Sequence, residues 1–471
     1  MILQKNNKRY YQFIKKYQLI ILMCNLLFTL NVVPQVREEW IAKYNGFGNG
    51  VDYAEAMVVD ISGNVYVTGY SAGLESLYDY ATIKYNSVGE EQWAVRYNGS
   101  GNKEDYANSI IVADSGDVYV TGSSVGKDSS YDYVTIKYSI SGEEQWVARY
   151  NGTGNAEDRV RSISMDSAGN VYVTGRSYGL GTDYDYLTIK YNGAGEEQWI
   201  ARYNGTDNST DSAYDIVIGA KDDIYVTGYS IGAGTLEDCV TIKYNYNGEE
   251  QWTARYNGPA NDMDGAVDIA IDNSDNVYIT GFSFGGDETM FNCVTIKYNN
   301  AGEEQWVARY SGSGYDTEAR AIAIDNSCNV YITGRSDNIE TDDDYVTIKY
   351  NNMGKEQWVK RYSSLGYYID RACSICVDKL GNSYVTGYSP GPGTSFDYVT
   401  IKYDSAGEEK WILRYNGLGN MQDFATDIAI DDCGNIFVTG ASDNLGIYPF
   451  NYEYATIKYS QQTFSEMFYF Y

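Results

Sequence analysis

Histidine is absent from the 471 residues of this chain. Its absence excludes histidine general bases, serine or cysteine nucleophiles activated by histidine, and zinc sites built on imidazole ligands. We therefore predict that the protein is not an enzyme and holds no cofactor, although carboxylates could still bind Ca²⁺.

Proline (5 residues) is scarce, whereas glycine (48) and tyrosine (50) are abundant. A chain rich in glycine and aromatics that shows no helical periodicity favours β structure.

Basic residues are outnumbered by acidic ones, and the net charge is −29. This balance argues against nucleic acid or an anionic membrane as a partner. It favours cations or basic surfaces, or else is only a solvated acidic exterior.

Long apolar runs are missing except for one, from Leu19 to Val33, which follows a basic stretch without acids. Such a pattern is typical of a secretory signal peptide, and the run is short for a membrane span of about 20 residues. We predict that residues 1–36 are a signal peptide, with a retained N-terminal anchor as the alternative. The mature chain is then exported and has no membrane span.

Cysteine is also sparse after the leader, and its pattern indicates neither a disulfide framework nor a metal site. The six positions are Cys239, Cys293, Cys328, Cys373, Cys376 and Cys433.

The chain is instead organised by a repeat of roughly 53 residues. Thr-Gly and Thr-Ile-Lys-Tyr each recur eight times, in step with the tryptophans. The tryptophans, spaced by 52 to 54 residues, are Trp40, Trp93, Trp146, Trp199, Trp252, Trp306, Trp358 and Trp411. A period of this length is typical of propellers and other repeat architectures.

Each repeat predicts four short strands separated by glycine-containing turns. In the third repeat the strands are expected at Val160–Asp166, Val171–Gly175, Tyr186–Tyr191 and Gln198–Tyr203. Four antiparallel strands in a repeat are the pattern of a propeller blade, because stacking blades in a ring buries both faces of each sheet. An open β-solenoid is the competing fold, but its coils are usually shorter.

The positions of the first and last strands predict how the ring closes. The mature chain begins with a tryptophan strand, Glu38–Tyr44, and ends with a Thr-Ile-Lys-Tyr strand, Thr456–Tyr459. The N-terminal strand would therefore complete the last blade and remove the open edge. We predict an all-β, monomeric, eight-bladed propeller over residues 37–459, with a short tail over 460–471.

Two series of aspartates recur near the longer loops, which we expect on one face of the disc. The first could form a ring of carboxylates that attracts Ca²⁺, or each member could hydrogen-bond its own loop backbone, which we favour. This first series is Asp52, Asp105, Asp158, Asp211, Asp264, Asp370 and Asp423. The second series is Asp79, Asp132, Asp185, Asp238, Asp344 and Asp397, to which the same structural interpretation applies.

Other repeated residues also have a structural interpretation. Lys84 is expected to oppose Glu91 across a hairpin, with Arg96 on the same outer strand, and such cross-strand ion pairs would fix the register. Tryptophan and tyrosine could stack on sugars, but their fixed positions favour packing between blades.

The motifs Asp-x-x-Gly-Asn-Val-Tyr-Val-Thr-Gly, Asp-Tyr-x-Thr-Ile-Lys-Tyr and Gln-Trp-x-x-Arg-Tyr-Asn-Gly resemble the bacterial SBBP-type β-propeller repeat family. The resemblance covers residues 38–459 and recurs in all eight repeats. It implies an exported or cell-surface, surface-layer-like bacterial protein and brings no catalytic residues.

A looser resemblance links Tyr-Asn-x-x-Gly-Glu-Glu-Gln-Trp to eight-bladed quinoprotein dehydrogenases, which would imply a quinone and calcium. The adjacent cysteines often found in those enzymes are missing here. We therefore expect a non-enzymatic scaffold that binds a protein or glycan at the cell surface through its long-loop face. A carbohydrate- or Ca²⁺-binding propeller is the alternative, and the quinoprotein-like enzyme is a third hypothesis. Function is expected where the repeats differ from one another.

Overall fold

The computed structural model describes residues 36–47, 50–74, 76–127, 130–286, 290–338, 340–364, 369–446 and 451–461. Within these ranges one unit, Glu38–Ser460, contains the whole propeller. Residues 1–35 and 462–471 lie outside the described residues, and with them nearly all of the predicted leader and tail. The described ranges contain no helix long and apolar enough to span a membrane.

The described strands form eight antiparallel sheets of four, which we number as blades along the chain. Blade 1 contains β2 (Asp52–Val59), β3 (Val65–Ala72), β4 (Tyr78–Tyr85) and β5 (Glu91–Tyr97). Blade 2 contains β6 (Asp105–Val112), β7 (Val118–Val125), β8 (Tyr131–Tyr138) and β9 (Glu144–Tyr150). Blade 3 contains β10 (Asp158–Met165), β11 (Val171–Gly179), β12 (Asp183–Tyr191) and β13 (Glu197–Tyr203). Blade 4 contains β14 (Asp211–Ile218), β15 (Ile224–Ile231), β16 (Glu237–Tyr244) and β17 (Glu250–Tyr256).

The second half of the ring follows the same plan. Blade 5 contains β18 (Asp264–Ile271), β19 (Val277–Phe284), β20 (Phe291–Tyr298) and β21 (Glu304–Tyr310). Blade 6 contains β22 (Thr317–Ile324), β23 (Val330–Asn338), β24 (Asp342–Tyr350) and β25 (Glu356–Tyr362). Blade 7 contains β26 (Arg371–Val377), β27 (Ser383–Pro390), β28 (Phe396–Tyr403) and β29 (Glu409–Tyr415). Blade 8 contains β30 (Asp423–Ile430), β31 (Ile436–Asp443), β32 (Tyr452–Gln461) and, from the other end of the chain, β1 (Val36–Tyr44).

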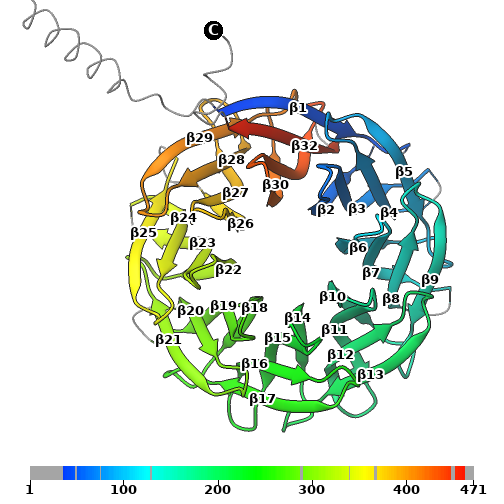
Figure 1. The fold of residues 1–471 in the computed structure, drawn as a ribbon, viewed down its shortest axis with the longest axis vertical. Helices are drawn as coiled ribbons and strands as arrows, with labels where there is room; N and C mark the ends of the chain where they lie inside the picture. The colour runs from blue at the N-terminus through cyan, green and yellow to red at the C-terminus, as the bar shows by residue number, and fades with distance from the viewer. Residues whose placement is uncertain are drawn as a thin grey trace, which may run out of the picture. The chain divides into compact units, whose positions relative to one another are not determined.

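The eight blades surround a common axis, with the first strand of each blade innermost and the tryptophan strand at the rim (Figure 1). The predicted eight-bladed propeller is therefore confirmed. In the third repeat the four strands lie where the sequence predicts them, but β10 begins two residues earlier, and β11 and β12 are longer than predicted because their pairing continues to Gly179 and Asp183.

The closure predicted from the first and last strands is also confirmed. β1 pairs with β32, so the two ends of the propeller chain share blade 8. Blade 8 is tied to blade 1 as well, because the Tyr454 hydroxyl donates to the Ala81 carbonyl at 3.2 Å and Lys458 Nζ donates to the Ser87 carbonyl at 3.1 Å.

The two middle strands of each blade are buried on both faces because every blade is sandwiched between two others. In β3, for example, the run Val65–Gly69 is fully buried. The repeated threonines lie in this core, where the Thr68 and Thr82 hydroxyls are 2.9 Å apart. All eight blades contain the equivalent pair, and each pair satisfies two buried hydroxyls that would otherwise cost free energy.

The innermost strand of every blade contains a β-bulge at the same place, between Ala54 and Ala56 in blade 1. A bulge leaves one extra residue outside the ladder and re-aims side chains. The bulged residues differ from blade to blade: Glu55, Asn108, Arg161, Tyr214, Val267, Arg320, Cys373 and Thr426. The repeat therefore fixes the backbone here and leaves the side chain variable.

Candidate ligand-binding site at the blade seams

The first aspartate series anchors the loops between blades. Asp105 is fully buried, and its Oδ2 accepts a 2.7 Å hydrogen bond from the backbone N–H of Gly99, six residues earlier. All seven members make this bond, at 2.5 to 2.9 Å. In blade 6, Thr317 replaces the aspartate, and its hydroxyl donates to the Ser311 carbonyl at 3.2 Å.

Burial raises the pKa values of the carboxyl groups in this series. Desolvation raises the pKa of Asp105 and of Asp423 to about 6, although nearby hydrogen-bond donors oppose the shift. In the part of the chain that the structure describes, no group of three or more Asp, Glu or Cys side chains is arranged to hold a metal ion. The carboxylates of the series are thus placed to hold loops, and calcium binding stays a prediction.

The second series pairs with arginine on the outer strand, as in the 2.9 Å contact between Arg96 and Asp79. The same arginine reaches the hydroxyl of Ser71 and, in the preceding blade, the hydroxyl of Tyr44 at 3.3 Å. Arg202, Arg255 and Arg414 reach the tyrosine hydroxyl of the preceding blade in the same way, so these arginines join their own blade's strands to an adjacent blade. These aspartates are structural.

The predicted pairing of the repeat lysine with glutamate is wrong. Tyr85, not Lys84, lies opposite Glu91, and a bulge between Lys84 and Tyr85 then places Lys84 opposite Trp93 rather than Gln92. Lys84 Nζ instead donates to the Ile140 carbonyl of the next blade at 3.4 Å and lies 4.9 Å from the centre of the Tyr66 ring.

The tryptophans pack between blades, as the structural interpretation proposed. The Trp93 ring lies 6.1 Å from Tyr66 in its own blade and 6.5 Å from Tyr138 in the next. Its Nε1 donates to the Ile140 carbonyl at 3.0 Å. Gly142, in the same turn at φ 83°, lies so close to this indole that a Cβ would be 2.8 Å from it. The repeat thus uses tryptophan and glycine to join neighbouring blades.

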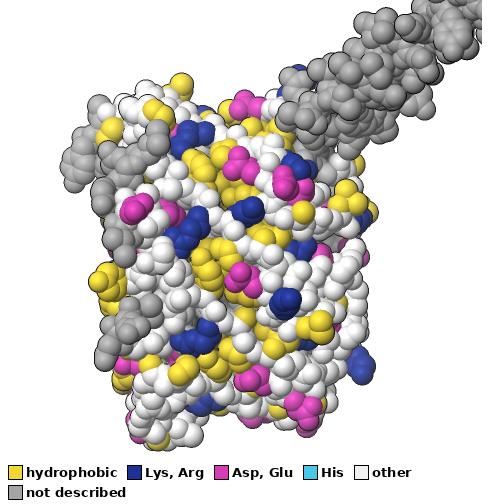
Figure 2. All heavy atoms as spheres, turned by 90° about the vertical axis from the view of Figure 1, so that its left-hand side faces the viewer, with side chains coloured by type: hydrophobic (Ala, Val, Ile, Leu, Met, Phe, Trp, Pro, Cys, Tyr) yellow, Lys and Arg dark blue, Asp and Glu magenta, His cyan; other side chains and the backbone are white. Residues whose placement is uncertain are grey.

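The rim shows no patch of a single charge on the side that Figure 2 presents, over blades 6 and 7. Acidic and basic side chains are interspersed there among hydrophobic ones. On this side, the sequence's acidic balance is not expressed as one continuous negative surface.

The repeats differ most at three positions that meet between consecutive blades near the long loops, and we call each such meeting place a seam. In the seam between blades 1 and 2 the three residues are Tyr70, Tyr78 and, from blade 2, Tyr106. The seam between blades 6 and 7 instead holds an ion network of Arg335, Asp343 and Arg371. Seams therefore share a backbone but differ in chemistry.

Aromatic residues occupy most positions of the three consecutive seams from blade 7 to blade 2, and Ala441 takes the remaining position between blades 8 and 1. In the first of them the Phe424 ring lies 4.9 Å from Tyr388 and 5.6 Å from Phe396. All of the rings are partly exposed. We call them the aromatic arc, which consists of Tyr388, Phe396, Phe424, Tyr452, Tyr53, Tyr70, Tyr78 and Tyr106.

A pocket of about 920 Å³ adjoins the blade 7 end of the arc. Phe396 lines the pocket and belongs to the arc, so the two are continuous. The other walls come from the within-blade loop Pro390–Ser395 and from Tyr362 and Arg414. This size suits a small ligand or a few residues of a peptide.

Carboxylates beside the bulges form polar bridges between the inner strands. Asp427 Oδ2 accepts the Met57 N–H of blade 1 at 2.9 Å, while its Oδ1 accepts the Ser374 hydroxyl of blade 7 at 3.0 Å. Asp215 and Asp268 occupy the same position in blades 4 and 5. They link blades rather than form a ligand site.

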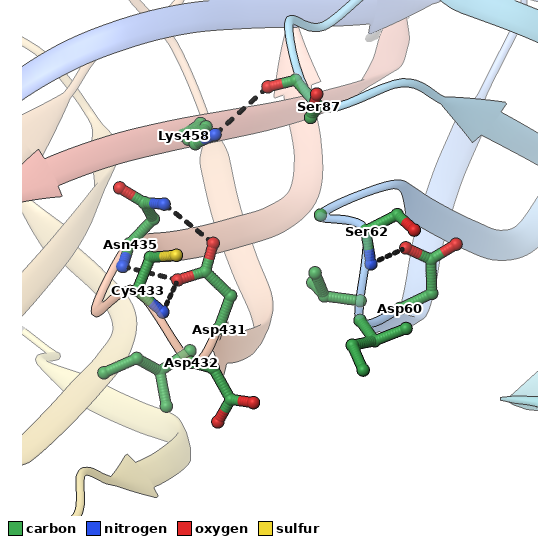
Figure 3. Close-up of a pocket in the computed structure, with 12 residues that line it drawn as sticks. Asp60, Ser62, Ser87, Asp431, Asp432, Cys433, Asn435 and Lys458 are labelled. Carbon is green, nitrogen blue, oxygen red and sulfur yellow. Dashed lines mark hydrogen bonds between the residues drawn. The ribbon is translucent and has the colours of Figure 1, made fainter. Parts of the chain in front are cut away.

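A second pocket, of about 500 Å³, lies on the opposite face between the first turns of blades 8 and 1 (Figure 3). Its carboxylates are engaged by their own turns: Asp431 Oδ1 accepts the backbone N–H groups of Cys433 at 2.9 Å and Asn435 at 2.8 Å. Asp60 accepts the Ser62 N–H in the same way at 2.8 Å. The lining groups are those that build the turns in other blades, so this pocket is a weaker candidate than the arc.

Comparison with known proteins identifies the repeat. The SBBP beta-propeller repeat model matches residues 40–74, 145–182 and 305–339. The chain carries SBBP repeats. Each match begins at or just before a tryptophan and ends beyond the second strand of the next blade, so the SBBP unit is offset from the structural blade.

Relatives of this SBBP propeller are distant. A WD repeat-containing protein of Acanthamoeba polyphaga mimivirus is 24% identical over 88% of this chain and 32% of its own length. The regulatory protein FlaEY of Caulobacter vibrioides is 23% identical over 74% of this chain and 43% of its own length. The chain therefore spans less than half of either relative. The crystal structure of Sqt1 from Chaetomium thermophilum, 7% identical, superposes with a TM-score of 0.53 over 91% of this chain and 100% of that one, which supports the fold alone.

Sequence reasoning missed the arc, although a signal for it was present. Tyr53 and Tyr106 directly follow the repeated aspartates of blades 1 and 2, where blade 3 has Arg159 and blade 5 has Gly265. An alignment of the eight repeats would show this column turning aromatic in blades 8, 1 and 2. What the alignment could not show is that rings from two blades meet in one seam.

Proposed function

We propose that this SBBP propeller is a non-enzymatic binding module that takes its ligand at the aromatic arc and the adjoining pocket. The observation that carries the proposal is that, among the described seam residues, rings from neighbouring blades contact each other only between blades 7 and 8 and between blades 1 and 2, whereas Phe282 and Phe291 in the 5–6 seam belong to one blade. Residues needed to build a blade recur in every blade, whereas the arc does not. Partly exposed aromatic clusters beside a pocket are typical of binding surfaces.

Several observations support a binding role over catalysis. The sequence has no histidine, and among the described residues the strongly shifted carboxyl groups lie in loop anchors and blade links or stand singly, as Glu55 does. The relatives include a protein named for WD repeats and one named as regulatory, which is consistent with a role in protein interactions. We further propose, from the leader, that the protein acts outside the cytoplasm, at the cell surface or in the medium.

The test is capture by purified propeller, wild type or variant, from envelope and medium fractions. Phe424→Ser should abolish capture of the partner, because Phe424 contacts three other rings of the arc. Val267→Ser, at a bulge outside the arc, is the control and should capture normally. A partner retained equally by wild type and Phe424→Ser would overturn the proposal, once both variants show a native thermal transition. A redox-active quinone in the purified protein would overturn its non-enzymatic part.

A further inference from the structure

The seam between blades 2 and 3, next to the arc, shows which kind of side chain packs on a seam tyrosine. Between blades 2 and 3, the guanidinium of Arg159 lies 3.4 Å from the centre of the Tyr131 ring. Arg159 occupies the position that Tyr106 occupies one blade earlier. The seam between blades 3 and 4 contains a similar contact, in which the Arg176 guanidinium lies 4.6 Å from the centre of the Tyr184 ring. Two seams of this chain thus hold arginine against tyrosine.

The seam between blades 1 and 2 has the rings without the arginine. No lysine or arginine in the described ranges lies over the face of Tyr70, Tyr78 or Tyr106. The ring faces carry negative electrostatic potential, which attracts a planar guanidinium more specifically than it attracts a neutral group. The three rings are partly exposed and so accessible to a partner's side chain.

Acidic side chains flank the same seam. Glu104 is partly exposed and, after burial and Tyr131, its charge is among the causes that raise the pKa of Tyr106 to about 12, while the charge of Arg159 in the next seam opposes the shift. Glu55, at the bulge of β2 two residues after Tyr53, is also among the charges that, after burial, raise the pKa values of Tyr53 and Tyr70. Aromatic faces with carboxylates at their edges match the two ways in which guanidinium is recognised, by stacking and by charge-assisted hydrogen bonds.

We propose that the seam between blades 1 and 2 binds an arginine side chain from a basic segment of a partner protein, in the manner of Arg159 on Tyr131. The inference rests on the proposed binding function and names its ligand class. The chain's net charge of −29 adds long-range attraction for such a segment.

The experiment measures binding of a short glycine- and serine-based peptide that carries arginine, by calorimetric titration of the full propeller. The same peptide with citrulline, which keeps the shape and loses the charge, is the comparison. We expect the arginine peptide to bind about 5- to 30-fold more tightly than the citrulline peptide. Equal affinity for the two peptides would overturn the proposal, as would binding of neutral oligosaccharides at this seam in place of the arginine peptide.

Variants locate the site. Tyr70→Leu should weaken binding of the arginine peptide by about 5- to 30-fold, whereas Tyr229→Leu, the equivalent position between blades 4 and 5, should not. Glu104→Gln, on a partly exposed side chain, should weaken binding in the same direction. Unchanged affinity in both Tyr70→Leu and Glu104→Gln would overturn the inference. If the arginine peptide does not bind but Phe424→Ser still loses the natural partner, the proposed binding function stands and only the arginine inference fails. If Phe424→Ser retains the natural partner, both the binding function and the arginine inference are overturned.

Discussion

Lys43 and Glu453 form an ion pair at the joint where the two ends of the propeller chain share blade 8. Six other blades place arginine and aspartate at these two positions. Both partners therefore differ from the repeat at the one blade whose outer strand comes from the other end of the chain, where β1 lies beside β32 (Figure 1). Glutamate is longer than the aspartate of the other blades and lysine is shorter than their arginine, so the ion pair is kept with the same sign of charge on each strand.

Removing one member of this pair should have unequal effects. The Glu453 side chain is 6% exposed and that of Lys43 is 30% exposed, so an unpaired Glu453 cannot reach water whereas an unpaired Lys43 can. We expect Lys43→Met to lower the free energy of unfolding by about 2–3 kcal/mol and Glu453→Gln by about 1 kcal/mol. Denaturant titration measures both. Equal losses would contradict the burial argument.

A matched control separates local pairing from ring closure. Arg414→Met removes the same interaction with Asp397 in blade 7, whose strands are continuous in sequence. Hydrogen exchange in β1 should accelerate in Lys43→Met and stay unchanged in Arg414→Met, because only the former loosens the strand that closes the ring.

Trp411 differs from the other tryptophans in having no hydrogen-bond acceptor for its buried Nε1 among the described residues. Each of the other seven donates to a carbonyl in the next blade's outer turn, at 2.9 to 3.3 Å. Blade 8 lacks that turn because β32 and β1 are not consecutive. We expect Trp411→Phe to cost about 1 kcal/mol less than Trp146→Phe, which breaks the bond to Gly193. Identical shifts in denaturation midpoint would argue against this account.

The sequence period was sufficient to predict the blades, their four strands and the closure by the first strand. These features follow from local turn chemistry and from a strand type that recurs at fixed spacing, so no long-range information was needed. The lysine register was wrong because the hairpin pairs Tyr85 with Glu91, and a bulge, which cannot be read from alternation alone, then moves Lys84 one further residue away to Trp93. A single bulged residue shifts every pairing beyond it.

The arc could not be predicted because it depends on contacts between blades. Tyr70 and Tyr106 are 36 positions apart in the chain, and their rings meet only once the ring of blades sets the distance between neighbours. The blade links had the same difficulty: Asp215 and Asp268 stand one repeat apart in the sequence, but only the fold shows that both carboxyl groups accept the Ile269 N–H. Sequence identified what repeats, and the structure identified which exceptions lie together.

Asp215 and Asp268 should make stability depend on pH. Both carboxyl groups accept the Ile269 N–H, at 3.3 Å from Asp215 Oδ2 and 2.8 Å from Asp268 Oδ1. Burial, and then the charge of Asp215, raise the pKa of Asp268 well above 3.8. Because the folded state binds this proton more tightly than the unfolded state, stability should fall as pH rises from about 4 through the raised pKa.

The variant Asp215→Asn should flatten this dependence. An asparagine keeps an oxygen for the Ser162 hydroxyl and can donate its amide to Asp268, so the shared proton is no longer needed. We expect the variant to gain about 1 kcal/mol or more relative to wild type between pH 4.5 and 8, measured by urea unfolding. Asp427→Asn is the comparison, because it loses the acceptor for Met57 and should destabilise; burial also raises the pKa of Asp427, so this variant should remove only that residue's own part of the slope and leave the part that comes from Asp268.

Glu55 should make binding of a basic peptide depend on pH. Burial raises the pKa of Glu55 to about 7, and the charge of Arg161 opposes that shift. Other titratable groups that interact with this carboxyl are Tyr53, Tyr70, Cys373 and Tyr454, and burial raises all of their pKa values too far for them to change charge between pH 6 and 8. The chain has no histidine to titrate there, and Asp105 beside Tyr106, with a pKa of about 6, titrates only at the lower edge of this range.

Raising the pH from 6 to 8 should therefore charge Glu55 and strengthen binding of the arginine peptide, by about 3- to 10-fold if the carboxylate contributes one exposed to half-buried charge contact. Glu55→Gln should bind at both pH values with the wild-type affinity seen at pH 6, because its amide resembles the protonated acid.

Asn108→Asp, which puts a carboxyl at the same bulge one blade later, controls for the added negative charge of the inner ring. Calorimetric titration at the two pH values gives the comparison directly. A pH dependence that persists in Glu55→Gln would place the responsible group elsewhere, and its absence in the wild-type protein would show that Glu55 does not face the bound arginine.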